Sequence, residues 1–201
     1  MKSIILDFDG TICQSYELIY QNLCQYSKLT PMIPAEELRS LSSSDVVKKL
    51  NLTTFDQARL IYTIRKDFKN KISGIPPVKG VLSVLKSLAA RGYELYLSTS
   101  NSKPNVAKFF DLNGGLPLKD LKSQSTIFGK ASGIQDLIKK HEIDKSQAVY
   151  VGDETRDIEA AKKSGIKSCA VSWGYNTKET LMKNKPDYFA SEPEDLLTLF
   201  A

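Results

Sequence analysis

The chain has 201 residues, of which 41% are hydrophobic and 25% charged, so it can bury a real core and is neither disordered nor fibrous. The net charge of +5 is mild and the lysines are spread along the chain, which predicts weak steering of anionic ligands and no nucleic-acid partner. No apolar run is long enough to cross a membrane and the start leaves no room for a signal peptide. With three scattered cysteines, these features predict a cytoplasmic protein.

The first predicted element is a short buried strand at residues 3–6, which ends in Asp7-Phe8-Asp9-Gly10. Residues 13–78 then show only helical periodicity, until Pro76-Pro77 marks the end of this segment. Because no convincing strand falls within it, we expect a helical insertion after the first strand.

From residue 81 onward, predicted helices and strands alternate. The helices cover 81–88, 104–112, 134–138 and 158–163, and the strands cover 94–98, 121–123, 148–151, 166–171 and 187–190, before a terminal helix. This alternation predicts an α/β fold with a mainly parallel, Rossmann-like sheet. The expected domains are an α/β core, residues 1–12 and 79–201, and an all-helical insertion, residues 13–78.

Polar side chains gather where the predicted strands end, and ligands of open parallel sheets bind at that edge. The strand ends and one helix start supply Asp7, Asp9, Thr11, Thr99, Ser100, Asn101, Lys130, Asp153, Glu154 and Asp157. Taken singly, each has an ordinary structural interpretation, such as a helix cap or a surface lysine. Their joint occurrence in this order predicts one polar site.

The carboxylates in this set are suited to Mg²⁺. Asp7 and Asp9 lie two residues apart, so in extended backbone they point to the same side, and Asp153 adds a third carboxylate. Gly10 allows backbone amides to approach an oxyanion, while Lys130 can neutralise phosphate charge. The residues themselves therefore favour phosphate chemistry.

The ordered motifs resemble those of the haloacid dehalogenase (HAD) superfamily. They are Leu6–Thr11, Leu97–Asn101, Lys130 and Val151–Asp157, and the stretch through Gly165 is typical of the phosphoglycolate phosphatase-like branch, subfamily IA. The resemblance implies a HAD-like core with an inserted helical cap. It also implies a Mg²⁺-dependent phosphatase that hydrolyses a small phosphorylated metabolite through an aspartyl-phosphate.

The resemblance also implies roles for the acids. Asp7 would be the nucleophile and a metal ligand, and Asp9 the general acid and base whose backbone carbonyl helps to hold the metal. Asp153 would bind the metal directly. Asp157 would orient metal-bound water or Lys130, and Glu154 would reach metal-bound water or only solvent.

The transferring phosphoryl group would be bound by Gly10, Thr99, Ser100 and Lys130. The cap would close over the site and select the leaving group. Its plausible substrate-facing residues are Gln14, Ser15, Tyr16, Arg39, Ser42, Ser44 and Lys48, although each is equally well explained as ordinary helix surface or loop.

Other functions are compatible with the same motifs. Asp9 favours phosphate esters over carbon–halogen bonds, but a sugar-phosphate mutase keeps both aspartates. A receiver-like protein that binds phosphate without turnover is a further alternative. The sequence leaves the substrate unnamed, and a monomer or weak homodimer is expected.

Overall fold

The computed structural model describes residues 2–27, 33–124 and 129–201. Within them lies a parallel sheet of six strands in the order β3-β2-β1-β4-β5-β6. The strands are β1 (Ser3–Leu6), β2 (Glu94–Thr99), β3 (Leu118–Ser123), β4 (Ala148–Gly152), β5 (Lys167–Val171) and β6 (Tyr188–Ala190). The predicted α/β class and parallel sheet are confirmed, and β3 begins three residues earlier than 121–123.

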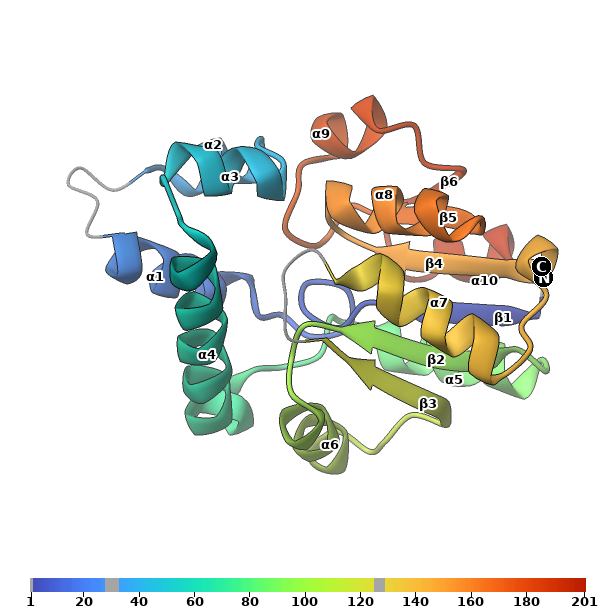
Figure 1. Ribbon diagram of the computed structural model, residues 1–201. Helices are drawn as coiled ribbons and strands as arrows, with labels where there is room; N and C mark the ends of the chain where they lie inside the picture. Colours follow the sequence, from blue (N-terminus) through green and yellow to red (C-terminus); the bar gives the residue numbers. More distant parts are fainter. Residues whose placement is uncertain (1, 28–32, 125–128) are drawn as a thin grey trace.

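Helices cover both faces of this sheet (Figure 1). The side chains of β1 alternate between the faces, since Ile4 and Leu6 pack in one apolar cluster and Ile5 in another. The first cluster includes side chains of α5 (Val81–Ala90), α6 (Lys103–Leu112) and α10 (Asp195–Leu199). The second includes α7 (Lys130–Lys140) and α8 (Thr155–Ser164), while α9 (Lys178–Lys183) packs on α8 and β5. A short 3₁₀ turn, η2 (Lys145–Gln147), leads into β4.

The segment between β1 and β2 is helical, as expected. It contains α1 (Tyr16–Ser27), α2 (Ala35–Arg39), α3 (Ser43–Lys49), α4 (Thr54–Lys71) and the 3₁₀ turn η1 (Ile72–Gly74). Thr53 and Asp56 form a capping box that starts α4, and Ser42 caps α3. The segment has an apolar cluster of its own, and it lies beyond the carboxyl ends of the strands (Figure 1).

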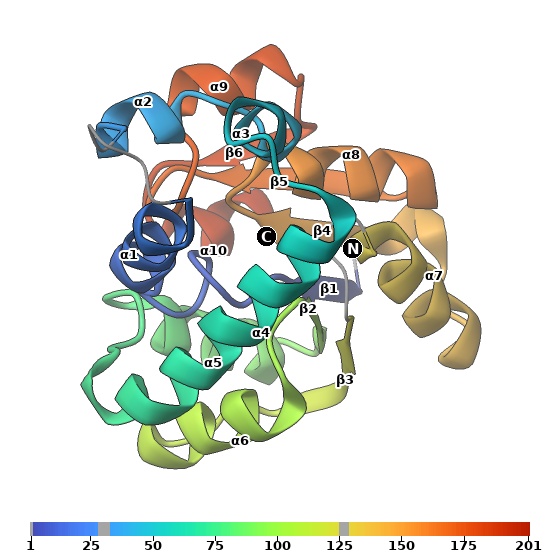
Figure 2. The ribbon, with the colours of Figure 1, turned by 60° about the vertical axis from the view of Figure 1, so that its left-hand side comes forward.

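The helical insertion contacts the core on two sides of that edge (Figure 2). On one side, Arg39 Nε donates to the carbonyl of Tyr175 at 3.0 Å, and Asn176 Nδ2 donates to Leu41 O at 2.8 Å. On the other side, Arg65 Nε donates to Ser100 O at 2.8 Å. The insertion is thus fastened above the edge where the predicted site lies. Each helix in the described ranges is too short or too polar to span a bilayer.

Candidate active site

Three buried carboxylates meet at the carboxyl edge of the sheet. Asp7 directly follows β1, Asp153 directly follows β4, and Asp157 lies in the first turn of α8. One ligand atom from each lies within 4.8 Å of the others. The structure therefore brings Asp7 and Asp153 together as expected, and it adds the carboxylate of Asp157 to the same cluster.

Lys130 is the cation of this cluster. It opens α7, its side chain is only 2% exposed, and its Nζ lies 2.7 Å from Asp7 Oδ2. It also forms an ion pair with Asp157. Burial lowers the pKa of Lys130, but the charges of Asp157 and Asp7 outweigh burial and raise the pKa above its ordinary value. Lys130 is therefore charged at neutral pH.

The three carboxylates carry more negative charge than Lys130 can neutralise. Burial raises the pKa of Asp7 and of Asp153, and the neighbouring carboxylates raise the pKa of Asp153 further. Burial likewise raises the pKa of Asp157, to about 6. A divalent cation would relieve this excess, and carboxylate oxygens are the donors that Mg²⁺ prefers. The residues present thus fit a Mg²⁺ ion.

Asp153 is fixed in one orientation. Its Oδ1 accepts a hydrogen bond from Thr11 Oγ1 at 2.7 Å, and its Oδ2 accepts one from the backbone N–H of Tyr175 at 2.6 Å. A Cβ added at Gly10 or at Gly174 would lie 2.2 Å from an atom of this side chain. Gly10 also has a φ of +82°, which favours glycine. A glycine is therefore required at position 10 to leave room for the side chain of Asp153.

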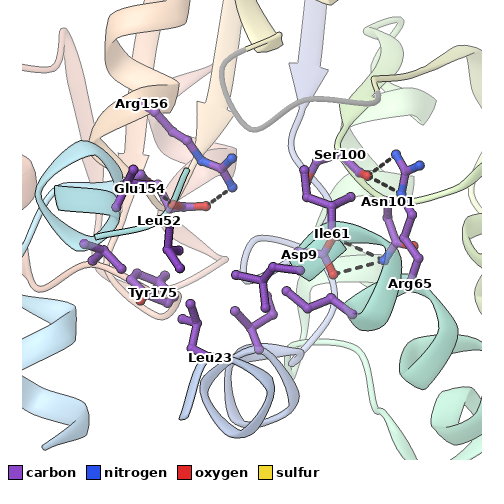
Figure 3. A pocket seen from close by; sticks show the side chains of 16 residues that line it. Asp9, Leu23, Leu52, Ile61, Arg65, Ser100, Asn101, Glu154, Arg156 and Tyr175 are labelled. Carbon is purple, nitrogen blue, oxygen red and sulfur yellow. Dashed lines mark hydrogen bonds and ion pairs between the residues drawn. The ribbon is translucent and has the colours of Figure 1, made fainter. Parts of the chain in front are cut away.

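Asp9 faces a different part of the site from the three clustered carboxylates. Both of its carboxylate oxygens lie 3.2 Å from Asn101 Nδ2 (Figure 3). Burial raises the pKa of Asp9, although the hydrogen bond from Asn101 acts against this shift. Asp9 is thus biased towards its protonated form, as a general acid requires.

The residues at the end of β2 hold Asn101 in place. The Thr99 hydroxyl oxygen accepts a hydrogen bond from Asn101 N at 2.9 Å, and Asn105 Nδ2 donates to Asn101 Oδ1 at 3.0 Å. Ser100 lines the same site, and its carbonyl accepts from Arg65 of the insertion. The sequence indicates Asn101 only as a polar residue at a strand end, because its contact with Asp9 joins positions 92 residues apart.

Glu154 is largely buried and does not face solvent, the second of its two expected surroundings. It forms an ion pair with Arg156 and accepts a hydrogen bond from Ser43 Oγ at 2.6 Å (Figure 3). Burial acts to raise the pKa of Glu154, but the charges of Arg156 and Lys130 prevail and lower it to about 2. Glu154 therefore stays ionised and joins α8 to the insertion. Arg156 could not be recognised from the sequence, where it looks like an ordinary exposed residue of a first helical turn.

A pocket lies between the insertion and the core, and residues of both line it (Figure 3). None of the seven cap residues predicted from the sequence lines this pocket, because they are mostly polar whereas much of the wall is aliphatic. The described lining residues are Asp9, Ile19, Leu23, Ser43, Val46, Val47, Leu52, Leu60, Ile61, Ile64, Arg65, Ser100, Asn101, Glu154, Arg156 and Tyr175.

Comparison with known proteins agrees with this geometry. The family model described as haloacid dehalogenase-like hydrolase matches residues 4–171. A phosphoglycolate phosphatase of Synechococcus elongatus is 30% identical over 98% of this chain and 96% of its own length. The pyrophosphatase PpaX of Bacillus pumilus is 24% identical over 99% and 96%. Among solved structures, a predicted phosphatase from Clostridium acetobutylicum has the same fold, with a TM-score of 0.79 at 22% identity, covering 98% of this chain and 97% of its own.

Proposed function

Because this chain belongs to the haloacid dehalogenase-like hydrolase family, we propose that it is a Mg²⁺-dependent phosphatase that forms a phosphoaspartate at Asp7. The substrate is a small phosphorylated metabolite. The observation that carries the proposal is the meeting of Asp7, Asp153 and Asp157 around the buried Lys130.

The metal would be held by the carboxylates of Asp7 and Asp153 and the backbone carbonyl of Asp9. Asp157, paired with Lys130, supports this set and balances its charge. When bound, Mg²⁺ would neutralise phosphate charge and polarise a phosphoryl oxygen.

The nucleophile is the ionised carboxylate of Asp7. An anion attacks an anionic phosphate poorly, so the contact between Lys130 Nζ and Asp7 Oδ2, at 2.7 Å, supports the reaction by placing a positive charge beside both groups. An oxygen of Asp7 forms a bond to phosphorus while the bond from phosphorus to the leaving oxygen breaks. The covalent intermediate divides one difficult transfer into two easier steps.

Asp9 supplies the proton. Its raised pKa favours the protonated form, which gives its proton to the leaving oxygen. The resulting carboxylate then takes a proton from water as the water oxygen attacks phosphorus and releases Asp7. Asn101, hydrogen-bonded to both carboxylate oxygens, holds the orientation of Asp9 throughout.

The phosphoryl group is bound at the end of β2 and beside Gly10. Lys130 neutralises its charge, and the hydroxyls of Thr99 and Ser100 and the backbone near Gly10 provide donors for its oxygens. The insertion, residues 13–78, acts as a cap that keeps bulk water from the intermediate. Its contacts from Arg39 and Arg65 to the core support this role.

Candidate substrates follow from the named relatives. The relatives above are named for phosphoglycolate and pyrophosphate, and both compounds carry a transferable phosphoryl group. Both belong in a first panel of phosphorylated metabolites.

The free cysteines, all buried, are compatible with the cytoplasm as the site of action.

The experiment is a phosphate-release assay on purified protein with Mg²⁺ and p-nitrophenyl phosphate. We expect turnover that EDTA removes and Mg²⁺ restores, and we expect Asp7→Asn to lower kcat by at least roughly 10³-fold. Asp111→Asn, at an exposed aspartate of α6, is the matched control and should leave kcat unchanged.

Undiminished activity of Asp7→Asn would eliminate the assigned nucleophile. A sugar-phosphate mutase would return the phosphoryl group to its substrate and release little inorganic phosphate, so the same assay separates the two activities.

A further inference from the structure

The pocket beneath the cap has two chemically different ends (Figure 3). Asp9, Ser100 and Asn101 form the end next to the phosphoryl site. A wall of aliphatic side chains comes from α1, α3, α4 and the turn before α4, while Glu154 and Arg156 lie across the pocket from Asp9 (Figure 3). The members of the wall are Ile19, Leu23, Val46, Val47, Leu52, Leu60, Ile61 and Ile64. A leaving group that extends from phosphorus past Asp9 therefore enters a hydrophobic space.

Two of these wall residues have no packing role in the described apolar clusters. Val47 and Ile61 are partly exposed, and they belong neither to those clusters nor to the side chains packed against them, whereas Leu60 belongs to the core of the cap. Apolar side chains that face a cavity next to a reactive site are the usual lining of a small-molecule pocket. A ligand that covers Val47 and Ile61 would remove their apolar surface from water.

The cations of the pocket are already engaged. Arg65 donates to the carbonyls of Ser100 and Gln124, and Arg156 is paired with Glu154. A leaving group with its own carboxylate or phosphate would need a cation in the wall, because burying an unpaired anion is costly. Among the described lining residues, Arg156 already has an anionic partner in Glu154, and Arg65, fixed by two backbone carbonyls, is the one arginine whose charge could serve such a group.

We infer that the physiological substrate is a phosphate monoester whose leaving alcohol has an aliphatic or aromatic body. The inference rests on the proposed phosphatase function and narrows its substrate class. In the reaction, Asp9 protonates the oxygen of this alcohol as its bond to phosphorus breaks, and the alcohol body remains against Val47 and Ile61 until the cap opens.

The first measurement is a substrate series on the unmodified protein with Mg²⁺. Methyl, propyl, hexyl and benzyl phosphate are compared with 2-phosphoglycolate and inorganic pyrophosphate. We expect kcat/KM to rise roughly fourfold for each methylene that reaches the wall, and hexyl or benzyl phosphate to exceed both charged compounds.

The second measurement alters the wall. We expect Val47→Thr and Ile61→Thr each to lower kcat/KM for hexyl phosphate roughly tenfold, without changing the value for methyl phosphate, which is too short to reach them. Phe55→Thr is the matched control, because Phe55 is an exposed apolar residue of α4 that does not line the pocket.

The outcomes separate this inference from the proposed function. If 2-phosphoglycolate or pyrophosphate is hydrolysed faster than the apolar esters, or if the two threonine variants lower kcat/KM equally for methyl and hexyl phosphate, the inference is wrong and the enzyme is still a phosphatase. If no compound in the series releases phosphate, the proposed function itself fails.

Discussion

Asp153, the proposed metal ligand, is positioned by several residues around it. Thr11 and the backbone N–H of Tyr175 each bind one of its oxygens, and two glycines leave the space that it fills. Mutation of a partner that orients a metal ligand typically lowers metal affinity by roughly 10- to 100-fold.

Thr11→Val should weaken Mg²⁺ binding roughly tenfold, because Asp153 Oδ1 loses its hydrogen bond from Thr11 Oγ1. Thr11→Ser keeps the hydroxyl and should bind Mg²⁺ as the original protein does. Trp173 is the single tryptophan and donates to the backbone carbonyl of Thr11 at 3.0 Å, so its fluorescence can follow the titration. Equal affinities for the valine and serine variants would contradict this role.

Gly174→Ala should destabilise the protein by about 1–3 kcal/mol and reduce its activity, since the new Cβ would meet the Asp153 side chain at 2.2 Å. Gly74→Ala is the control, because nothing lies within 4 Å of a Cβ built there. Urea unfolding of both variants checks the prediction. A Gly174→Ala protein as stable as the Gly74→Ala protein would show that the contact relaxes without cost.

The residues of the site divide into those that the sequence could indicate and those that it could not. Asp7 and Asp153 follow buried strands, so their meeting could be predicted from parallel strands alone. Asn101 and Arg156 could not be assigned roles, because their partners depend on how loops pack across the sheet. Polarity suggested Ser42 and Ser44 as cap contacts, whereas Ser43 between them reaches Glu154.

At the scale of elements, α4 is attached to the core by Phe68, which packs against Phe8, and by the polar side chain of Arg65. Arg65 donates to the carbonyls of Ser100 and Gln124, and its own carbonyl accepts from Asn105 Nδ2 at 2.9 Å. The planar guanidinium can serve two acceptors at once, which a lysine ammonium does poorly in a fixed geometry. The polar part of the attachment between the cap and the end of β2 therefore depends on Arg65.

Arg65→Lys should loosen α4 even though the charge is kept. We expect faster hydrogen exchange at the amides of residues 54–71 and a kcat/KM lower by roughly tenfold, because cap closure is less complete. Lys66→Gln removes an exposed charge from the same helix and serves as the control. If the amides of residues 54–71 exchange at the same rate in the Arg65→Lys and Lys66→Gln proteins, the hydrogen bonds of Arg65 do not help to hold the cap in place.

The end of α7 is tied to β3 by Asp120. Its carboxylate accepts from His141 Nε2 at 2.9 Å and from Lys140 Nζ at 2.6 Å. Burial acts to raise the pKa of Asp120, but the hydrogen bonds from His141, Lys140 and Leu121 N prevail and hold it well below its usual range. A carboxyl group with a lowered folded-state pKa stabilises the protein above its unfolded pKa of about 4, and this stabilisation is lost as the pH falls towards the folded value.

Asp120→Asn should therefore lower the free energy of unfolding by about 1 kcal/mol at pH 7, and the difference from the original protein should shrink below pH 4. Chemical unfolding at pH 7, 5 and 3 tests this dependence. A difference that is constant over the three pH values, or that grows at pH 3, would contradict the assigned pKa direction.

For the whole molecule, alternating helices and strands were enough to predict a parallel α/β core with a helical insertion. The start of β3 was missed because this strand lies at the edge of the sheet, where Lys119 and Asp120 interrupt the apolar pattern. The pocket could not be predicted, because neighbouring valines of α3 look alike in sequence. Val46 is buried in the cap core, whereas Val47 lines the cavity. Which of the two faces the cavity depends on how α3 packs against α4, and the sequence does not give that packing.

The covalent intermediate at Asp7 is the central claim, and chemical trapping tests it most directly. The protein is mixed with Mg²⁺ and excess p-nitrophenyl phosphate, quenched in acid during turnover and reduced with borohydride, which converts a phosphoaspartate to homoserine. Peptide mass spectrometry should then find homoserine at position 7, dependent on substrate and on Mg²⁺. Steady turnover without homoserine at position 7, or with homoserine at another aspartate, would contradict the account.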